Sequence, residues 1–398
     1  MSGKMKKGIS REGLLLVVVV LFWFALYLHI PYQTPFLTGA GVAAGFTGTI
    51  VGAYGITQLF FRLPLGVLAD YAGKHKIFVV LGAGLAGLAC AVRILVPTGP
   101  GFLAANLISG CAASMWIAYM VLYSNYFSKK EQQKATSKVI MACNLGMCLA
   151  FVFSSCFYGK MGMSFLCGAG VLAGIAGVIG GLFVKEDLIP VNGKAGERPG
   201  IGTYLSVCGN KRLILFALLA LIQQGIQMAT AMSFTTQILE NLGASALFIG
   251  CASIFYMIAA VASAQFASTD LCARKGPAFY VPLVFFLTAI YCILVPVSGN
   301  IYVIFVLQAF PGMSTGILLS YLTSESMKEV PREKSSTAMG FFQAVYAVGM
   351  TLFPWAVGVL TENFDIKMGY NFLASAAFVG TVVSMIYYRK ANEKKSFT

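Results

Sequence analysis

Three polar residues whose types suit ligand binding lie inside a long apolar segment of the chain. Tyr54, Gln58 and Arg62 recur every four residues, so they share one face of a helix. They would present a hydroxyl, an amide and a guanidinium to the same groove. Arg62 precedes Asp70 by eight residues, which is about 12 Å along a helix. A cation so far inside an apolar segment is a candidate for binding an anionic group.

Arg62 has no acidic partner at its own depth. All 14 Asp and Glu residues fall in loops or at the ends of apolar segments. An Arg at the centre of a bilayer costs roughly 2.5 to 3.5 kcal/mol, so a compensating contact is expected. We interpret Arg62 as a contact to a substrate anion. The alternatives are a role in a coupling network, or a structural Arg bonded to backbone carbonyls.

Other polar and aromatic pairs recur at helical spacing in further apolar segments. They are Gln223 with Gln227, Trp116 with Tyr119, and Gln343 with Tyr346, while Gln308 and Thr315 are single candidates. A hydrogen bond between helices in a bilayer is worth about 0.6 kcal/mol, so helix packing is the alternative function for each of them. Arg93 lies near the end of its segment, and we expect it to extend to the lipid headgroups.

The composition identifies the elements that must hold these side chains. The chain is 58% hydrophobic and 11% charged, with a mean hydropathy of +0.80, whereas about a quarter of the residues of a soluble domain are charged. Apolar windows of roughly 20 residues predict an all-α, multi-pass membrane protein with 12 spans. The expected spans are 14–32, 46–69, 77–97, 102–123, 138–158, 163–184, 213–238, 247–267, 278–297, 302–322, 338–360 and 370–388.

The net charge of +14 reports orientation rather than binding to nucleic acid. Most of the 28 Lys and Arg residues lie at the termini or in loops on one side of the expected spans. This bias predicts that both termini face the cytoplasm. The ten Cys residues show neither paired nor metal-ligand spacing, so we expect no disulfide, metal or cofactor.

The expected spans divide into two halves of six. Residues 1–184 and 212–398 are joined by a polar loop, 185–211, which contains several Pro and Gly residues. Asp70 with Lys74 is echoed 200 residues later by Asp270 with Arg274. Internal repeats of this kind are typical of transporters whose halves rock around a site at the membrane midplane.

The stretch FRLPLGVLADYAGKHK, residues 61–76, resembles the loop signature between spans two and three of the major facilitator superfamily. The matching residues are Gly66, Leu68, Ala69, Asp70, Gly73 and Lys74. The resemblance implies a cytoplasmic gate made of Gly66, Asp70, Gly73, Lys74, Asp270 and Arg274, with Asp70 facing the start of span eleven. It also implies that spans one, four, seven and ten line the cavity, which favours Tyr27, Trp116, Gln223, Gln227, Gln308 and Thr315.

The sequence departs from the family's proton antiporters at two places. Asn106 stands where their span-four motif has an Arg, and span five lacks their Gly-Pro pair. No carboxylate lies at mid-membrane depth either, and the remaining candidates for a proton carrier, His29, Glu240 and Glu325, lie nearer the span ends. These departures disfavour a standard multidrug exporter.

We therefore expect a monomeric secondary transporter in the cytoplasmic (inner) membrane. It would move a small organic solute, preferably anionic or zwitterionic, by alternating access between its halves. A coupling proton is left open. The alternatives are a proton-driven exporter of lipophilic compounds and a membrane sensor that transports nothing. We do not expect an enzyme, because the chain has two His residues, expected on opposite sides of the membrane, and no buried carboxylate.

Overall fold

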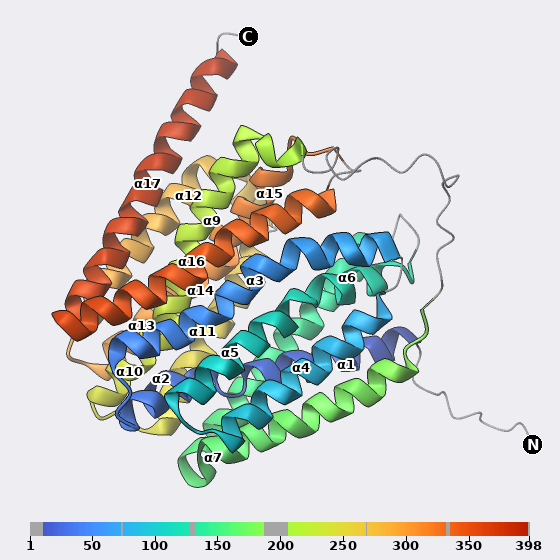
Figure 1. Ribbon diagram of the computed structural model, residues 1–398. Helices are drawn as coiled ribbons and strands as arrows, with labels where there is room; N and C mark the ends of the chain where they lie inside the picture. The colour runs from blue at the N-terminus through green and yellow to red at the C-terminus, as the bar shows by residue number, and fades with distance from the viewer. Residues whose placement is uncertain are drawn as a thin grey trace, which may run out of the picture.

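The computed structural model describes residues 11–72, 75–127, 132–186, 206–267, 269–331 and 335–396. Throughout these ranges the elements are helices, without strands, which confirms the predicted all-α class (Figure 1). Ten segments of the described chain are long and apolar enough to cross a membrane. One of them, Lys138–Phe183, reverses at Gly162, where φ is 73°, and so forms two antiparallel helices. With these two antiparallel helices counted separately and the 29-residue α3 added, the segments are compatible with the predicted 12 spans.

Seven helices form the N-terminal half. They are α1 (Arg11–Tyr27), α2 (Ile30–Gly39), α3 (Ala44–Ala72), α4 (Lys76–Leu95), α5 (Gly99–Ser114), α6 (Trp116–Ser124) and α7 (Gln132–Phe183). The expected first span is therefore broken between α1 and α2 at Leu28 and His29. Pro31 in the first turn of α2 explains the break, because Pro lacks the N–H that would continue the helix.

The C-terminal half has the same succession of long helices with more interruptions. Its elements are α9 (Lys211–Ala229), η2 (Thr230–Phe234), α10 (Thr235–Asn241), α11 (Ala246–Ala267), α12 (Asp270–Leu294), η3 (Val295–Val297), α13 (Ile301–Leu307), α14 (Ala309–Met313), η4 (Ser314–Leu318), α15 (Leu319–Met327), α16 (Ser335–Asn363) and α17 (Ile366–Ser396), preceded by the short η1 (Ser206–Gly209). Two of these, η2 and η4, are π-helical turns. Such turns are rare in proteins overall, but those that occur are often found at functional sites.

The two halves meet along α3 and α16, which lie side by side across the front of Figure 1. Glycines make this approach possible. A Cβ atom on Gly48 or Gly52 would collide with the carbonyl oxygens of Pro354 and Thr351. Helix pairs in bilayers are held largely by such close packing of small residues. The α3–α16 seam is thus the main contact between the halves.

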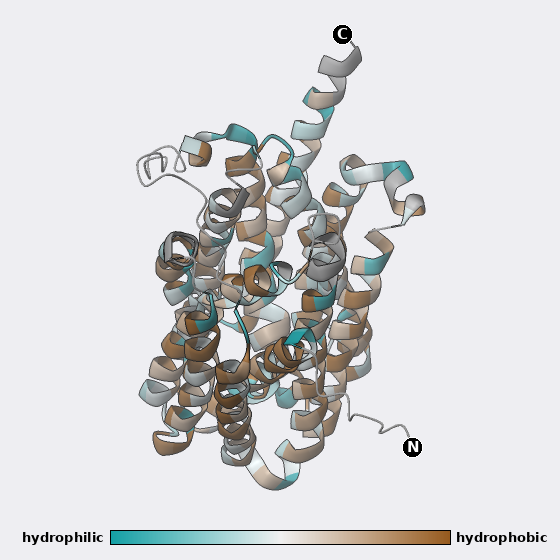
Figure 2. Ribbon diagram, turned by 90° about the vertical axis from the view of Figure 1, so that its right-hand side faces the viewer, coloured by the Kyte–Doolittle hydropathy of each residue, from teal (hydrophilic) through white to brown (hydrophobic). Residues whose placement is uncertain are grey.

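Three hydrogen bonds also join the halves at the end of the bundle opposite the described termini, which we call the outer end. The Tyr32 hydroxyl donates to the carbonyl of Ala246 at 2.7 Å. The Thr34 and Ser233 hydroxyls are 2.9 Å apart. The backbone N–H of Gly45 donates to Oε2 of Glu362 at 2.8 Å. The hydropathy colouring shows that the helices are largely apolar along their length, as expected for membrane spans (Figure 2).

Candidate functional site

Arg62 lies in the α3–α16 seam and joins the two halves. Its side chain is 7% exposed, and Nη1 donates to Oε1 of Gln343 at 3.0 Å and to the hydroxyl of Tyr346. The guanidinium also lies over the Tyr346 ring, 5.2 Å from its centroid. The compensating contacts expected for a deeply buried Arg are therefore neutral side chains. Three predicted residues from two different spans meet here.

A second polar chain connects helices of the C-terminal half. Gln227 donates to the Tyr256 hydroxyl at 2.6 Å, and that hydroxyl is 2.9 Å from Oγ1 of Thr315 in the π-turn η4. Gln223 extends the chain, with its amide nitrogen 3.4 Å from Oε1 of Gln227. Tyr256 on α11 is the link that joins the predicted residues. Oε1 of Gln223 is buried without a hydrogen-bond partner within the described chain, as is Oε1 of Gln58 on α3.

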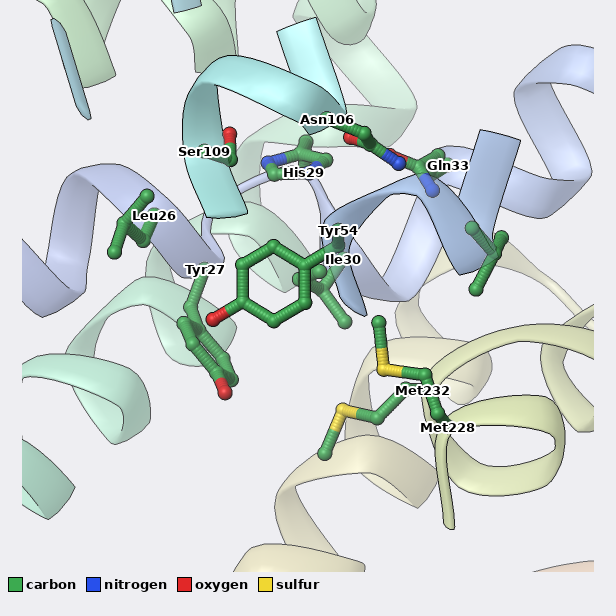
Figure 3. Close-up of a pocket in the computed structure, with 11 residues that line it drawn as sticks. Leu26, Tyr27, His29, Ile30, Gln33, Tyr54, Asn106, Ser109, Met228 and Met232 are labelled. Carbon is green, nitrogen blue, oxygen red and sulfur yellow. The ribbon is translucent and has the colours of Figure 1, made fainter. Parts of the chain in front are cut away.

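A small cavity lies between the halves, beside the break in the first span (Figure 3). Its lining residues are Leu26, Tyr27, His29, Ile30, Gln33, Val51, Tyr54, Asn106, Ser109, Met228 and Met232. Tyr27 and Tyr54 stand next to each other at its centre, and the two Met side chains face them from the C-terminal half. Because Tyr54 shares a helix face with Gln58 and Arg62, the cavity and the Arg62 cluster are about 12 Å apart along α3.

Three predicted residues pack within their own half instead: Tyr119 and Gln308 are buried, and Trp116 is partly exposed. Tyr119 is fully buried, stacks on Phe22 at 4.7 Å and donates to the carbonyl of Val79 at 2.7 Å. Trp116 packs edge-on against Trp23. Gln308 is fully buried, and Oε1 is 3.4 Å from the hydroxyl of Tyr291 in the core of the C-terminal half. None of the three lines the cavity.

Arg93 does not extend to the lipid headgroups, so that expectation is wrong. Its side chain is 1% exposed, and Nη2 donates to Oδ1 of Asn106 at 2.7 Å and to Oγ of Ser109 at 3.1 Å. Asn106 in turn donates to the carbonyl of Ile50 at 2.7 Å. The outer part of the site therefore contains a second buried cation, held on residues that line the cavity. Sequence reasoning placed Arg93 by its distance from the span end and missed the two acceptors on α5.

Two of the three candidate proton carriers have a clear place in the structure. His29 is 2% exposed at the break between α1 and α2 and lines the cavity, which is a deeper position than expected. Glu325 lies in an ion cluster at the end of α15, where it contacts both Arg212 and Lys328. Glu240 lies at the exposed end of α10.

The predicted gate is described in part. Gly73 and Lys74 lie outside the described residues, and only the backbone of Gly66, Asp70 and Asp270 is described. The backbone of Asp70 belongs to the last turn of α3, Asp270 begins α12, and Arg274 is exposed. Beside this region, the Glu186 carboxylate accepts a hydrogen bond from the backbone N–H of Lys76 at 3.1 Å and also contacts His75. An acid at this helix start satisfies unpaired N–H groups and complements the helix dipole.

The described part of the chain contains no group of three His, Cys, Asp or Glu side chains that would hold a metal ion. The chemistry of the site is therefore that of two buried guanidinium groups, one imidazole, and several amides and hydroxyls. Such a site can bind and orient a polar or anionic solute. The Met and aromatic side chains of the cavity add an apolar wall.

Comparison with known proteins gives a consistent result. The family model for the Major Facilitator Superfamily matches residues 15–329 and 217–398. The proton-coupled antiporter flippase LtaA of Staphylococcus saprophyticus is 23% identical over 395 residues, covering 97% of this chain and 96% of that protein. The inner membrane transport protein YajR of Escherichia coli is 23% identical over 139 residues, which is 35% of this chain and 30% of that protein.

Solved structures share the fold at low sequence identity. The nucleoside transporter NupG has a TM-score of 0.76 and 15% identity, over 95% of this chain and 99% of that one. The POT family transporter PepTSo has a TM-score of 0.75 and 14% identity, over 98% of this chain and 99% of that one.

Proposed function

Because the chain belongs to the major facilitator superfamily, we propose that it is a secondary active transporter that carries a small organic solute between two six-helix halves. The observation that carries the proposal is the polar contact of Arg62 with Gln343 and Tyr346, which crosses from one half to the other. Alternating access requires such a contact to break and re-form. A solute bound there would be exposed to one side of the membrane and then to the other.

The charge of the cluster favours an anionic or zwitterionic cargo. The hydrogen-bond partners of Arg62 within the described chain are an amide and a phenol, so the guanidinium charge is not neutralised. A carboxylate or phosphate adds charge–charge attraction and can accept two parallel hydrogen bonds from a guanidinium, which a neutral acceptor does not offer. A carboxylate or phosphate group that replaces Gln343 or Tyr346 would therefore bind more strongly than they do. The buried, unpartnered Oε1 atoms of Gln58 and Gln223 would accept hydrogen bonds from donors elsewhere on the cargo.

A proton-driven exporter of lipophilic compounds is the second candidate. Met228 and Met232 form one wall of the cavity, and Met side chains adapt to varied apolar ligands. One relative is named as a proton-coupled antiporter and flippase. Drug resistance that depends on the pH gradient and extends to unrelated dyes would favour this candidate over a carrier of organic anions.

Counterflow in liposomes tests the carrier assignment without any assumption about the driving ion. Purified protein is reconstituted in vesicles loaded with one unlabelled solute, and entry of the same labelled solute is followed. Organic anions, amino acids, sugars and cationic drugs form the panel. We expect a transient accumulation of label for one anionic or zwitterionic solute, and no accumulation with Arg62→Gln. Thermal stabilisation by a solute that never shows counterflow would instead identify a sensor.

A further inference from the structure

The break between α1 and α2 brings together four polar residues around a buried imidazole. His29 immediately precedes the first turn of α2, and Gln33, Asn106 and Ser109 line the same cavity as His29 (Figure 3). Arg93 on α4 donates to both Asn106 and Ser109 from behind the cavity wall. The mechanism proposed above uses Arg62 and leaves this cluster without a role.

Several polar atoms of the cluster are buried and unsatisfied. Nε and Nη1 of Arg93, Nδ1 of His29 and Oε1 of Gln33 have no hydrogen-bond partner within the described chain. An unsatisfied buried donor or acceptor costs about 1 to 3 kcal/mol, and more when the group is charged. The hydrogen-bond acceptors of the buried Arg93 guanidinium are uncharged, so a negatively charged group nearby would stabilise it.

The charges around His29 are all of one kind. Arg93 donates to Asn106 and Ser109, which line the same cavity as the imidazole. The titratable side chains nearby are Tyr27 of α1, Tyr54 of α3 and Cys90 of α4. The facing wall from the C-terminal half consists of Met228 and Met232. No carboxylate lines the cavity, so a protonated His29 and Arg93 would form two neighbouring cations without a resident counter-ion.

We propose that this cavity is a joint site for a proton and an oxyanion, in which His29 takes the proton, the protonated imidazole binds a carboxylate or phosphate group, and Arg93 behind Asn106 and Ser109 adds to the attraction for that group. The anion removes the repulsion between the two cations, so its binding and protonation of His29 are mutually favourable. Such coupling is reciprocal: each ligand raises the affinity for the other by the same factor. The site deepens the proposed transport function, because it supplies a way to link movement of an anionic cargo to a proton.

Only the proton changes its covalent partner in this scheme. The neutral imidazole accepts H⁺ from water at one membrane face and returns it to water at the other face. The anion is carried in the same direction as the proton. Repulsion between unpaired cations disfavours the half-loaded form in which His29 is protonated and the anion is missing.

The two His residues of the chain permit a direct test. In the full-length His75→Gln variant, His29 is the sole histidine, and its ring nitrogens can be followed by NMR from pH 5 to 9 after ¹⁵N-histidine labelling. The titration is recorded first without added salt as the reference, and then with sodium acetate, sodium phosphate or sodium chloride at equal ionic strength. Acetate and phosphate represent an oxyanion group of a cargo, and chloride represents a free inorganic ion.

We expect acetate or phosphate to raise the titration midpoint of His29 by about one pH unit, which corresponds to a tenfold coupling. Arg93→Lys keeps the charge and retains part of the shift, whereas Arg93→Gln removes it. Arg62→Gln retains the whole shift, because Arg62 is not part of this cavity. An equal shift with chloride identifies an inorganic anion as the occupant and overturns the assignment to an oxyanion group.

A His29 midpoint that does not respond to any of these salts overturns the joint site. The titration needs no transport, so its failure is distinct from a failure of counterflow. If counterflow succeeds and the midpoint is unmoved, the carrier assignment stands and the proton site is wrong. If the midpoint shifts and no solute shows counterflow, the proton site stands and the carrier assignment is wrong.

Discussion

The guanidinium of Arg62 donates to the side-chain oxygen of Gln343 at 3.0 Å, and this bond joins the two halves of the protein through a cation with an uncharged partner. The arrangement differs from an ion pair in one important respect. A neutral partner holds the Arg in place without cancelling its charge, so an anion entering the seam gains the full electrostatic attraction. We therefore expect the identity of residue 343 to control how strongly an anion binds at Arg62.

Gln343→Glu is expected to abolish binding of an anionic cargo while the protein stays folded. The new carboxylate would form an ion pair with Arg62 and neutralise the positive charge of the guanidinium. Arg62→Gln should give the same loss by removing the cation. Both are measured as the shift in melting temperature that a cargo produces. Retained stabilisation in both variants would show that Arg62 is structural.

The glycine seam between α3 and α16 predicts a second result. Gly52→Val would drive a branched side chain into the backbone of Thr351. Overpacking of this kind costs about 1 to 3 kcal/mol, so a lower melting temperature or separated helices is expected. Gly168→Ala on α7 is the matched control, because a Cβ atom there has no neighbour within 4 Å. Ala in a helix interior is favoured over Gly by up to about 1 kcal/mol, so this control should be neutral or stabilising.

The sequence predicted the helix-forming segments well because length and apolar character suffice for that inference. Because a deeply buried cation needs polar partners, a compensating contact for Arg62 was expected, and Gln343 and Tyr346 supply it. The partners themselves depend on which helices meet across the seam, and spacing along one helix carries no such information. Arg93 shows the limit most clearly. Its distance from the span end predicted exposure, whereas acceptors on α5 hold it inside.

Local clues to the outer cavity were present in the chain. Pro31 follows His29 by two residues, a spacing that indicates a helix break at the imidazole. His29 and Gln33 are four residues apart and thus share a helix face. The approach of Met228 and Met232 from the other half, however, depends on how the halves pack. That packing is a long-range property, which explains why this wall was not predicted.

Glu325 and Glu329 should differ sharply in their contribution to stability. The Glu325 side chain is 3% exposed and contacts Arg212 and Lys328, whereas Glu329 is 55% exposed and is 3.2 Å from Arg212. Glu325 attracts two cations from a buried position, so its removal is expected to cost more than removal of an exposed carboxylate. An exposed pair is worth about 1 kcal/mol or less. Glu325→Gln is therefore expected to lower the melting temperature several times more than Glu329→Gln, and equal effects would contradict the burial of this cluster.

Tyr256→Phe separates a packing role from a binding role for the polar chain of the C-terminal half. The change removes the hydroxyl that accepts from Gln227 and faces Thr315, but it keeps the aromatic ring. If these residues contact the cargo, counterflow should weaken about tenfold or more while stability falls by only about 0.6 kcal/mol. Tyr302→Phe is the control, because Tyr302 is 69% exposed. Unchanged counterflow in Tyr256→Phe would assign the chain to helix packing.

Glu362 is expected to hold the outer end of the bundle closed. Its Oε2 accepts the backbone N–H of Gly45 in the first turn of α3, where N–H groups lack helical partners and the helix dipole attracts an anion. Such a contact is worth about 0.3 to 2 kcal/mol, which is enough to shift a balance between two conformations without unfolding either. Glu362→Gln should therefore raise the population in which the outer end is open.

Thr34→Cys supplies a reporter of this opening, because Thr34 is fully buried in the outer contact with Ser233. Labelling of this reporter by a membrane-impermeant maleimide should become faster in the Glu362→Gln background. Asp365→Asn is the matched control, because that carboxylate bonds the N–H of Met368 within its own half. Equal labelling rates in the two backgrounds would place the outer latch elsewhere along the seam.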